Sequence, residues 1–217
     1  MPKLRVHNLA MSVDGYVAGP DQSLDAPLGV GGERLHDWAM VTRSFRTAHG
    51  MGDEGETGTD DDYIARGTTG IGATVMGRNM FSPYRGPWEG EAAEWTGWWE
   101  DEPPFHHPVF VLTHHPRPPL VLADTTFHFV RDGIEDALRQ AYDAAGGLDV
   151  RLGGGADTVR QYLRAGLVDE LHVAIVPILL GAEERLFEDV GGPDGYECVE
   201  HVASAGVTHV VFARRTG

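Results

Sequence analysis

The chain has 217 residues, 41% of them hydrophobic and 23% charged, which is typical of a globular protein that can bury a core. Its 33 acidic and 17 basic residues give a net charge of −16, which disfavours nucleic acid and anionic membranes as partners, because phosphate-rich surfaces need clustered Lys and Arg. No stretch is long and apolar enough to span a membrane, no signal peptide is visible, and the lone Cys198 cannot form an internal disulfide. These features predict a cytoplasmic protein.

The N-terminal part of the chain predicts a strand, one helix and a long acidic loop. Alternating side chains predict a strand over residues 3–11, and a turn follows at 14–15. Residues 33–45 have apolar side chains at helical spacing and predict a helix. The segment 47–62 is rich in glycine and acids, has almost no apolar residue, and predicts a mobile loop, with a short helix at 63–69 after it.

The middle of the chain contains a strand that leads directly into a glycine and an arginine. Residues 73–76 predict a short buried strand, and Gly77 and Arg78 follow it at the start of a helix. Segment 83–104 contains four of the five tryptophans among Gly, Pro and Glu, and predicts an irregular excursion packed by its own aromatic side chains. Further strands are expected at 108–113, 120–122 and 126–130, and a helix at 134–145.

Three consecutive glycines, Gly153 to Gly155, separate the end of a strand from a helix that ends near Leu163. Glycines let the backbone approach a ligand closely, because no Cβ intervenes. The helix that follows offers free N–H groups and the positive end of its dipole to an anion, most often a phosphate. Two alternatives stay open: the glycines form a turn that only connects two elements, and Asp157 or Thr158 caps the helix.

The C-terminal part predicts a long apolar strand at 167–178 and a hairpin formed by 197–203 and 207–213. Strands alternate with helices early in the chain, and a hairpin comes late. No internal repeat or domain boundary is visible, so we expect a single domain over residues 1–217. The fold class is α/β, with a mostly parallel central sheet, helices on both faces and an antiparallel hairpin at the C-terminal edge.

The order of these segments resembles the dihydrofolate reductase-like fold. It is most similar to the branch that contains the C-terminal reductase domain of bacterial riboflavin biosynthesis enzymes and their stand-alone relatives. The matching segments span nearly the whole chain and are residues 8–18, 75–78, 109–113, 153–155 and 168–171. The resemblance implies an NADPH-dependent reductase of a small heterocyclic substrate, either pterin-like or ribosylaminopyrimidine-like, that forms a homodimer. The apolar late strands 171–178 and 207–212 are expected to form the shared surface of the dimer.

The resemblance also implies where the adenosine 2′-phosphate of the cofactor binds. In that family the arginine after the second strand pairs with this phosphate, which here is Arg78, and a planar guanidinium suits a phosphate dianion. The start of the same helix and the end of the next strand supply neighbouring contacts. These residues are Gly77, Asn79, Met80, Thr113 and His114.

The remaining cofactor contacts come from the glycines and the first strand. The resemblance places the pyrophosphate over Gly153, Gly154 and Gly155, and the family often has a cis peptide bond between the first two of these glycines. The helix N-terminus consists of Ala156, Asp157 and Thr158, and the nicotinamide is held by Ala10, Val17 and Ala18.

Two aspartates are candidate proton donors for a hydride transfer, in which the cofactor supplies the hydride. Asp14 lies in the turn beside the expected nicotinamide site, and Asp37 roughly matches an acid on the first helix of dihydrofolate reductases. The alternatives are a plain turn aspartate and a solvated helix residue.

Three further points limit the functional interpretation. Tyr16 replaces the basic residue that riboflavin reductases commonly have after the Asp-Gly turn, and residues 22–32 lack their Ser-x-Trp-Ile-Thr-Gly segment, so the substrate stays open. The adjacent histidines at 106–107 and 114–115 are not accompanied by a Cys cluster or a His-Glu-x-x-His motif, so we expect no metal site. An alternative function is a non-catalytic nucleotide-binding protein that retains the fold.

Overall fold

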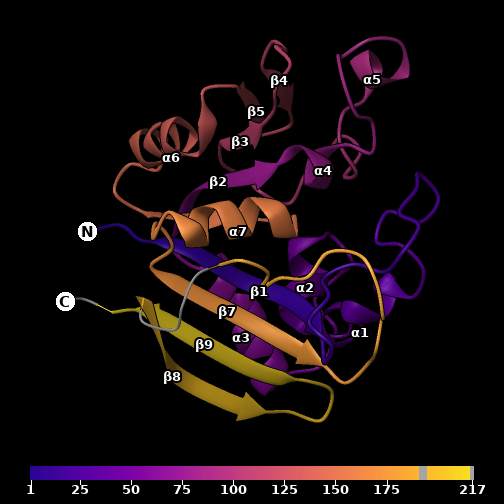
Figure 1. Cartoon of the computed structure of the whole chain (residues 1–217), viewed down its shortest axis with the longest axis vertical. Helices are drawn as coiled ribbons and strands as arrows, with labels where there is room; N and C mark the ends of the chain where they lie inside the picture. Colours follow the sequence, from indigo (N-terminus) through magenta and orange to yellow (C-terminus); the bar gives the residue numbers. More distant parts are fainter. Residues whose placement is uncertain (191–194, 216–217) are drawn as a thin grey trace.

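Nine strands form one sheet, and the computed structural model describes residues 1–190 and 195–215 of the chain (Figure 1). The strands are β1 (Leu4–Ser12), β2 (Ile71–Gly77), β3 (Val109–Leu112), β4 (Leu120–Leu122), β5 (Thr125–Val130), β6 (Asp149–Leu152), β7 (Glu170–Val176), β8 (Tyr196–Ala203) and β9 (Thr208–Arg214). Their order in the sheet is β4-β5-β3-β2-β6-β1-β7-β9-β8. The six neighbouring strands β5, β3, β2, β6, β1 and β7 are parallel to one another. Strand β4 pairs antiparallel with β5, and the β8–β9 hairpin pairs antiparallel with β7 through β9, which confirms the predicted fold class.

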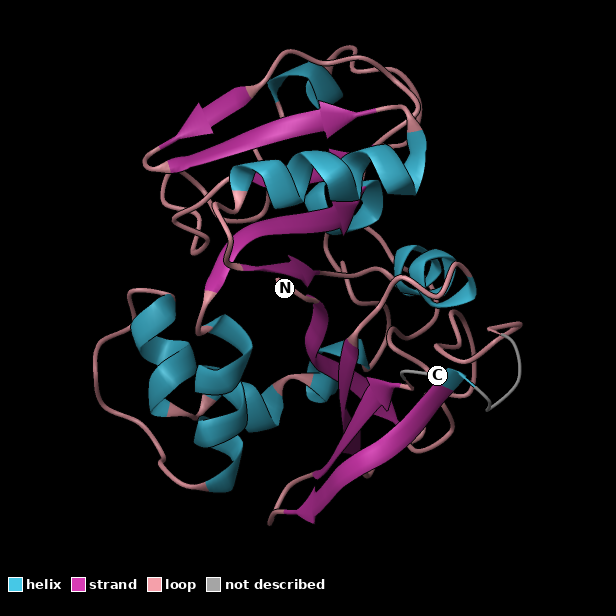
Figure 2. Ribbon diagram, turned by 90° about the vertical axis from the view of Figure 1, so that its left-hand side faces the viewer, coloured by secondary structure: helices cyan, strands magenta, loops and turns pink. Residues whose placement is uncertain are grey.

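Helices cover both faces of the sheet. They are α1 (Asp37–Met40), α2 (Arg43–Ala48), α3 (Thr59–Thr68), α4 (Arg78–Phe81), α5 (Glu91–Glu94), α6 (Gly133–Ala144) and α7 (Ala156–Arg164), with a 3-10 turn η1 (Gly32–Leu35) before α1. Figure 1 shows α7 in front of the sheet and α3 behind it, and the turned view of Figure 2 separates the two layers. Within the described residues, no helix combines the length and apolarity of a membrane crossing.

The apolar side chains form one core on the first face of the sheet and two separate cores on the second. On the first face, α6 and α7 cover residues of the central strands, including Val75, Val150 and Leu152. On the second face, η1, α1 and α3 cover parts of β1 and β7. The tryptophan-rich segment 83–104 packs separately on β3 and β5 around Phe81 and Phe127. Strand β6 contributes apolar residues to the first face only, so its second face lies between the two covers.

The expected helix at 33–45 is divided into η1, α1 and α2; His36 separates η1 from α1, and Thr42 separates α1 from α2. The Thr42 backbone is extended, and its Oγ1 accepts a hydrogen bond from Phe45 N and donates one to Ala39 O. A threonine that bonds locally to the backbone in this way favours a helix cap over a helix interior.

Helix α3 begins at Thr59, four residues before the helix expected at 63–69. The run Asp60–Asp62 therefore lies in its first turn, where carboxylates interact favourably with the helix dipole. Asp61 also accepts a hydrogen bond from Ser44 N at 2.6 Å. The loop prediction was wrong for residues 47–48, which belong to α2, and for residues 59–62, which belong to α3, while the mobility of the segment between the two helices stays a prediction.

A chain of buried hydrogen bonds connects α3 to the sheet. Asn8 N donates to His172 Nδ1 at 3.1 Å, His172 Nε2 lies 3.0 Å from His209 Nδ1, and His209 Nε2 lies 2.7 Å from Asp60 Oδ1. Since a backbone N–H can only donate, neutral His172 carries its proton on Nε2, and His209 donates to Asp60. Tyr63 stacks on both imidazoles, with ring centroids 4.6 and 4.0 Å away. The chain therefore satisfies the backbone of Asn8, which has a φ of 57° where β1 shifts its register against β7.

The buried histidines predict that acid destabilises the fold. Burial lowers the pKa of His172 to about 2, whereas an unfolded histidine titrates near 6.5. Between these values only the unfolded chain binds the proton, so this one residue reduces the free energy of unfolding by up to about 1.4 kcal/mol per pH unit as the pH falls. Denaturant unfolding from neutral to mildly acidic pH should show a shallower pH slope for His172→Gln. The same change at exposed His201 should leave the slope as it is, and equal slopes for His172→Gln and the wild-type protein would contradict the account.

A second prediction concerns the contact between the end of β2 and the start of α7. Gly77 N donates to Gly154 O at 2.9 Å, and a Cβ on Gly77 would lie 2.1 Å from Thr158 Oγ1. Gly77→Ala should therefore destabilise the protein by roughly 1–3 kcal/mol through overpacking. In a Thr158→Ala background the cost should be smaller, because the clashing oxygen is gone. A double-mutant cycle of unfolding free energies measures this coupling, and an equal cost in both backgrounds would refute it.

Candidate functional site

A cleft of about 650 Å³ opens on the second face of the sheet. Strand β1 and the ends of β2 and β6 contribute to its lining, together with α4 and the start of α7. Ile64 and Phe45 line it from the helices, Trp99 lines it from the tryptophan-rich segment, and Phe105 lines it directly after that segment. The cleft therefore lies where the two covers of the sheet separate.

All fifteen residues that the resemblance assigns to the cofactor line this cleft. Their location is a structural fact, while their contacts with a cofactor stay a prediction. The cis peptide bond, expected between Gly153 and Gly154, instead joins Gly154 and Gly155. The first glycine follows the last residue of β6 but still bonds to β2, because Gly153 N donates to Val75 O at 2.8 Å, so the turn begins one residue later than expected.

Arg78 is the centre of a cationic cluster at one end of the cleft. Its guanidinium lies 3.4 Å from the centroid of the Trp88 ring, and its Nη1 donates to Thr113 Oγ1 at 3.3 Å. Its Nε and Nη2 are buried without a hydrogen-bond partner. Burial, followed by the charges of Arg117 and Arg85, lowers the pKa of Arg78. None of the described acidic groups forms an ion pair with these three arginines, although the chain has 33 acids, so the cluster is suited to an anion from outside the chain.

The N-terminus of α7 has no side-chain cap. Its N-cap residue is Gly155, and no side chain bonds to it there. The Asp157 carboxylate instead accepts a hydrogen bond from Gln161 Nε2 at 2.7 Å and lies 3.5 Å from Arg160 Nη2. The Thr158 side chain occupies the space where a Cβ on Gly77 would lie. The capping alternative for Asp157 and Thr158 was therefore wrong. The first turn of the helix keeps its N–H groups available to a ligand, as an anion site requires.

Neither candidate proton donor lines the cleft. The Asp14 carboxylate accepts hydrogen bonds from Ser12 Oγ at 2.6 Å and from the backbone N–H groups of Leu180 and Gly181, and the bond from Ser12 is the largest cause that lowers the pKa of Asp14. It therefore connects the first turn to a distant loop, and a lowered pKa is the opposite of what a proton donor needs. Asp37 is exposed and lies in a separate surface depression beside Arg34.

Several unpartnered polar groups line the cleft, and sequence reasoning predicted a role for only one of these residues, Arg78. Eight buried side-chain nitrogen and oxygen atoms of the described residues lack a partner, and seven of them belong to cleft residues. The residues are His7, Asn8, His36, Trp38, Arg78 and Arg151. An unsatisfied buried polar group costs about 1–3 kcal/mol, so this concentration indicates a site for a polar ligand. Among the described residues, no three His, Cys, Asp or Glu side chains gather as metal ligands.

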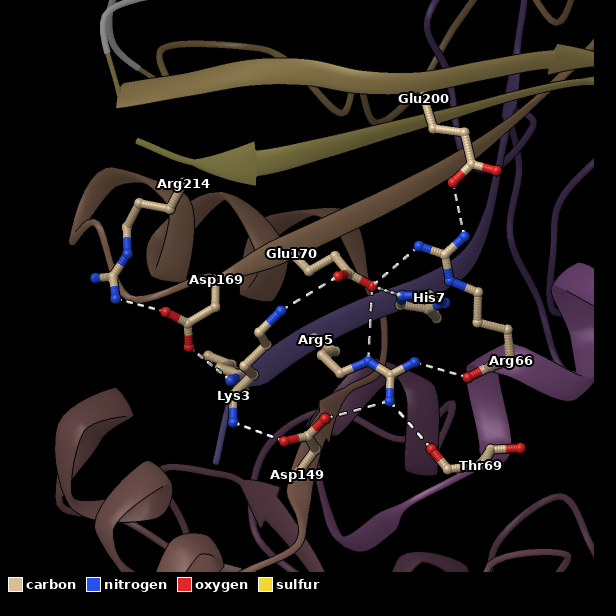
Figure 3. A network of polar contacts seen from close by, with 11 residues as sticks. Lys3, Arg5, His7, Arg66, Thr69, Asp149, Asp169, Glu170, Glu200 and Arg214 are labelled. Carbon is tan, nitrogen blue, oxygen red and sulfur yellow. Dashed lines mark hydrogen bonds and ion pairs between the residues drawn. The ribbon is translucent and has the colours of Figure 1, made fainter. Parts of the chain in front are cut away.

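His7 is held in one orientation by Glu170. Its Nε2 lies 2.6 Å from Glu170 Oε1, and Figure 3 shows Glu170 surrounded by basic side chains. The hydrogen bond from His7 is the largest cause that lowers the pKa of Glu170 to about 2, and burial lowers the pKa of His7. Neutral His7 therefore carries its proton on Nε2, which leaves Nδ1 as an unpartnered acceptor.

Comparison with known proteins identifies the family. The family model of the RibD C-terminal domain matches residues 2–210. A solved structure of a candidate riboflavin biosynthesis protein from Shewanella sp. PV-4 is similar over 100% of both chains, with 21% identity and a TM-score of 0.64. A dihydrofolate reductase from Enterococcus faecalis, complexed with NADP(H) and RAB-propyl, is 13% identical, with a TM-score of 0.51 over 98% of this chain and 97% of that one. No curated protein matches the chain significantly. The chain, with its dihydrofolate reductase-like fold, belongs to the family of the RibD C-terminal domain.

Proposed function

We propose that the protein is an NADPH-dependent reductase of a small heterocyclic substrate. The observation that carries this proposal is Arg78, whose guanidinium stacks on Trp88 and presents two buried nitrogen atoms without a partner. A phosphate dianion supplies the acceptors and the charge that these atoms lack. NADPH differs from NADH by one such phosphate, and family membership supports reductase chemistry.

The other parts of the cleft fit the rest of the cofactor. Gly155 and the uncapped α7 N-terminus offer backbone N–H groups to a pyrophosphate, whereas Gly153 N and Gly154 N already donate to Val75 O and Met80 Sδ. The absence of a Cβ on these two glycines still lets the pyrophosphate approach the backbone closely. Ala10, Val17 and Ala18 give a small apolar surface for the nicotinamide. When bound, the cofactor supplies the hydride, and the chain supplies position and exclusion of water.

The polar atoms on β1 favour a heterocycle with N–H groups. His7 Nδ1 and Asn8 Oδ1 are both acceptors without a partner, and both residues line the cleft. A pterin-like or ribosylaminopyrimidine-like ring carries amino and ring N–H donors that match them. The apolar side chains of Ile64 and Phe105 provide walls against which a flat ring can pack.

A homodimer stays part of the proposal, but its interface differs from the expectation. The strands expected to form it, 171–178 and 207–212, mostly lie inside the sheet, where β7 pairs with β1 and β9, and β9 pairs with β7 and β8. Strand β8 is the edge of the sheet on that side, and Val199 on it is exposed. A second copy would therefore approach β8 more easily than β7 or β9. A cytoplasmic location likewise stays an expectation.

The experiment on Arg78 tests the cofactor. Arg78→Ala should weaken NADPH binding by roughly 1.5–3 kcal/mol, the usual contribution of a hydrogen bond to a charged group, or about tenfold to a hundredfold in affinity. NADH should bind to the variant and the wild-type protein alike, because it has no 2′-phosphate. Quenching of tryptophan fluorescence measures both affinities, and Arg139→Ala, at an exposed arginine on α6, is the matched control for charge loss. An equal change for both nucleotides would contradict the assignment.

A second measurement separates the reductase from its alternative, a nucleotide-binding protein without activity. The oxidation of NADPH is followed by absorbance against pterins, ribosylaminopyrimidines, flavins and quinones. If the wild-type protein oxidises NADPH with one of these compounds, and Arg78→Ala slows this oxidation at low NADPH concentration, the result supports the reductase. Selective NADPH binding with no turnover of any compound favours the alternative.

A further inference from the structure

Arg151 lies on the floor of the cleft, in the middle of the sheet. In β6 its neighbours Val150 and Leu152 point into the core under α6 and α7, where both are buried. Because side chains alternate along a strand, Arg151 and Gly153 face the opposite side, which is the side of the cleft. Arg151 itself lines the cleft. It therefore lies on the face of β6 that neither apolar cover reaches.

Its cross-strand neighbours have partners, but Arg151 has none. Arg5 on β1 donates to Thr69 O at 3.1 Å, Arg66 O at 2.6 Å and Asp149 Oδ2 at 3.3 Å, as Figure 3 shows. On the other side, Thr74 Oγ1 of β2 lies 2.8 Å from His107 Nε2. No hydrogen bond or ion pair connects the Arg151 side chain to any described residue, and its Nε is completely buried.

The groups around Arg151 do not compensate its charge. Burial and then the Arg151 charge lower the pKa of His107 to about 4, so His107 is neutral near pH 7. The acids closest in the sheet, Asp149 and Glu170, are already paired with Arg5. The Arg151 side chain is half-buried, and its Nε is completely buried. Burial lowers the pKa of Arg151, but a guanidinium keeps its charge, and a partly desolvated charge without a counter-charge is unfavourable.

The Arg151 site is separate from the Arg78 site. Thr74 on β2 is the register partner of Arg151 on β6. Arg78 comes four residues after Thr74, so its backbone lies about 13 Å farther along the strand direction than that of Arg151. The Arg78 side chain also points toward Thr113 after β3, on the side of β2 away from β6. A single phosphate at Arg78 therefore leaves Arg151 without a counter-charge.

We propose that Arg151 is a further specificity-determining residue, which binds a carboxylate or a phosphate of the substrate. Two residues separate Arg151 from Gly153, or about 7 Å along the strand, which places the acidic group beside the cofactor glycines. His7 and Asn8 on β1 then contact the ring of the same molecule. The inference rests on the proposed function for its substrate, whereas the anion site stands on the geometry of Arg151 alone.

Matched ligands test the site without cofactor or turnover. Pterin is compared with pterin-6-carboxylate, and ribose with ribose 5-phosphate, by binding to the wild-type protein, Arg151→Met and Arg151→Lys. In the wild-type protein one acidic member should bind about tenfold to a hundredfold more tightly than its neutral partner, as a charge-assisted hydrogen bond predicts. Arg151→Met should abolish this preference, and Arg151→Lys should retain part of it. The pair that shows the preference identifies the group as carboxylate or phosphate.

A direct readout comes from the arginine Nε–Hε signals in NMR spectra, where Arg151→Lys identifies the Arg151 signal. Titration with pterin-6-carboxylate, ribose 5-phosphate and inorganic phosphate should shift this signal with at least one of them, while the signal of fully partnered Arg5 stays in place. An unmoved Arg151 signal with all three probes, or an acid preference that persists in Arg151→Met, would overturn the proposal. NADPH affinity should be equal in Arg151→Met and the wild-type protein. The binding of acidic ligands at Arg151 and the binding of NADPH at Arg78 are therefore tested by separate measurements, and one assignment can fail without the other.

Discussion

A charged side chain that is removed from water needs a counter-charge or a hydrogen-bond partner, and this need explains how the cleft is arranged. Arg5 and Arg151 are adjacent in register on neighbouring strands, yet they have opposite surroundings. Arg5 is surrounded by carbonyl and carboxylate oxygens and helps to connect β1 with α3. Arg151 faces the cleft with no counter-charge among the described residues, as Arg78 does at the other end. We therefore propose that these exceptions, in an acidic chain, mark the places where a ligand binds.

The sheet creates the cleft by separating its two covers. The hydrogen-bond chain from Asn8 through His172 and His209 to Asp60 holds α3 over β1 and β7. The aromatic side chains around Phe81 hold the tryptophan-rich segment over β3 and β5. Between them β6 ends in glycines that leave the strand end open. The helices over β1 and β7 and the tryptophan-rich segment over β3 and β5 are stabilised independently. The cleft between them can therefore have apolar side chains on its sides and the charged Arg151 on the sheet at its base.

The sequence predicted the parts of the site that depend on local geometry. The junctions at Gly77 and at Gly153 to Gly155 were recognisable, because a strand, glycines and a helix follow one another along the chain. The sequence did not place Asp37 correctly. Helix α1 has only four residues, and packing decides which of its sides faces the cleft. The adjacent His36 and Trp38 line the cleft instead. Arg151 was visible as a charged residue inside an alternating strand, but only the structure shows that no acid lies opposite it. The partner of Asp60, His209, comes from a strand about 150 residues away.

The most direct test of this account is the structure of the protein in complex with NADP⁺. The account predicts that the 2′-phosphate oxygens lie within hydrogen-bond distance of Arg78 Nε and Nη2, the two atoms that lack partners in the free chain. It also predicts the pyrophosphate over Gly153 to Gly155, at the N-terminus of α7. A nucleotide bound in the cleft with its 2′-phosphate away from Arg78, or bound outside the cleft altogether, would contradict the central claim that the unpaired cations of the cleft are ligand sites.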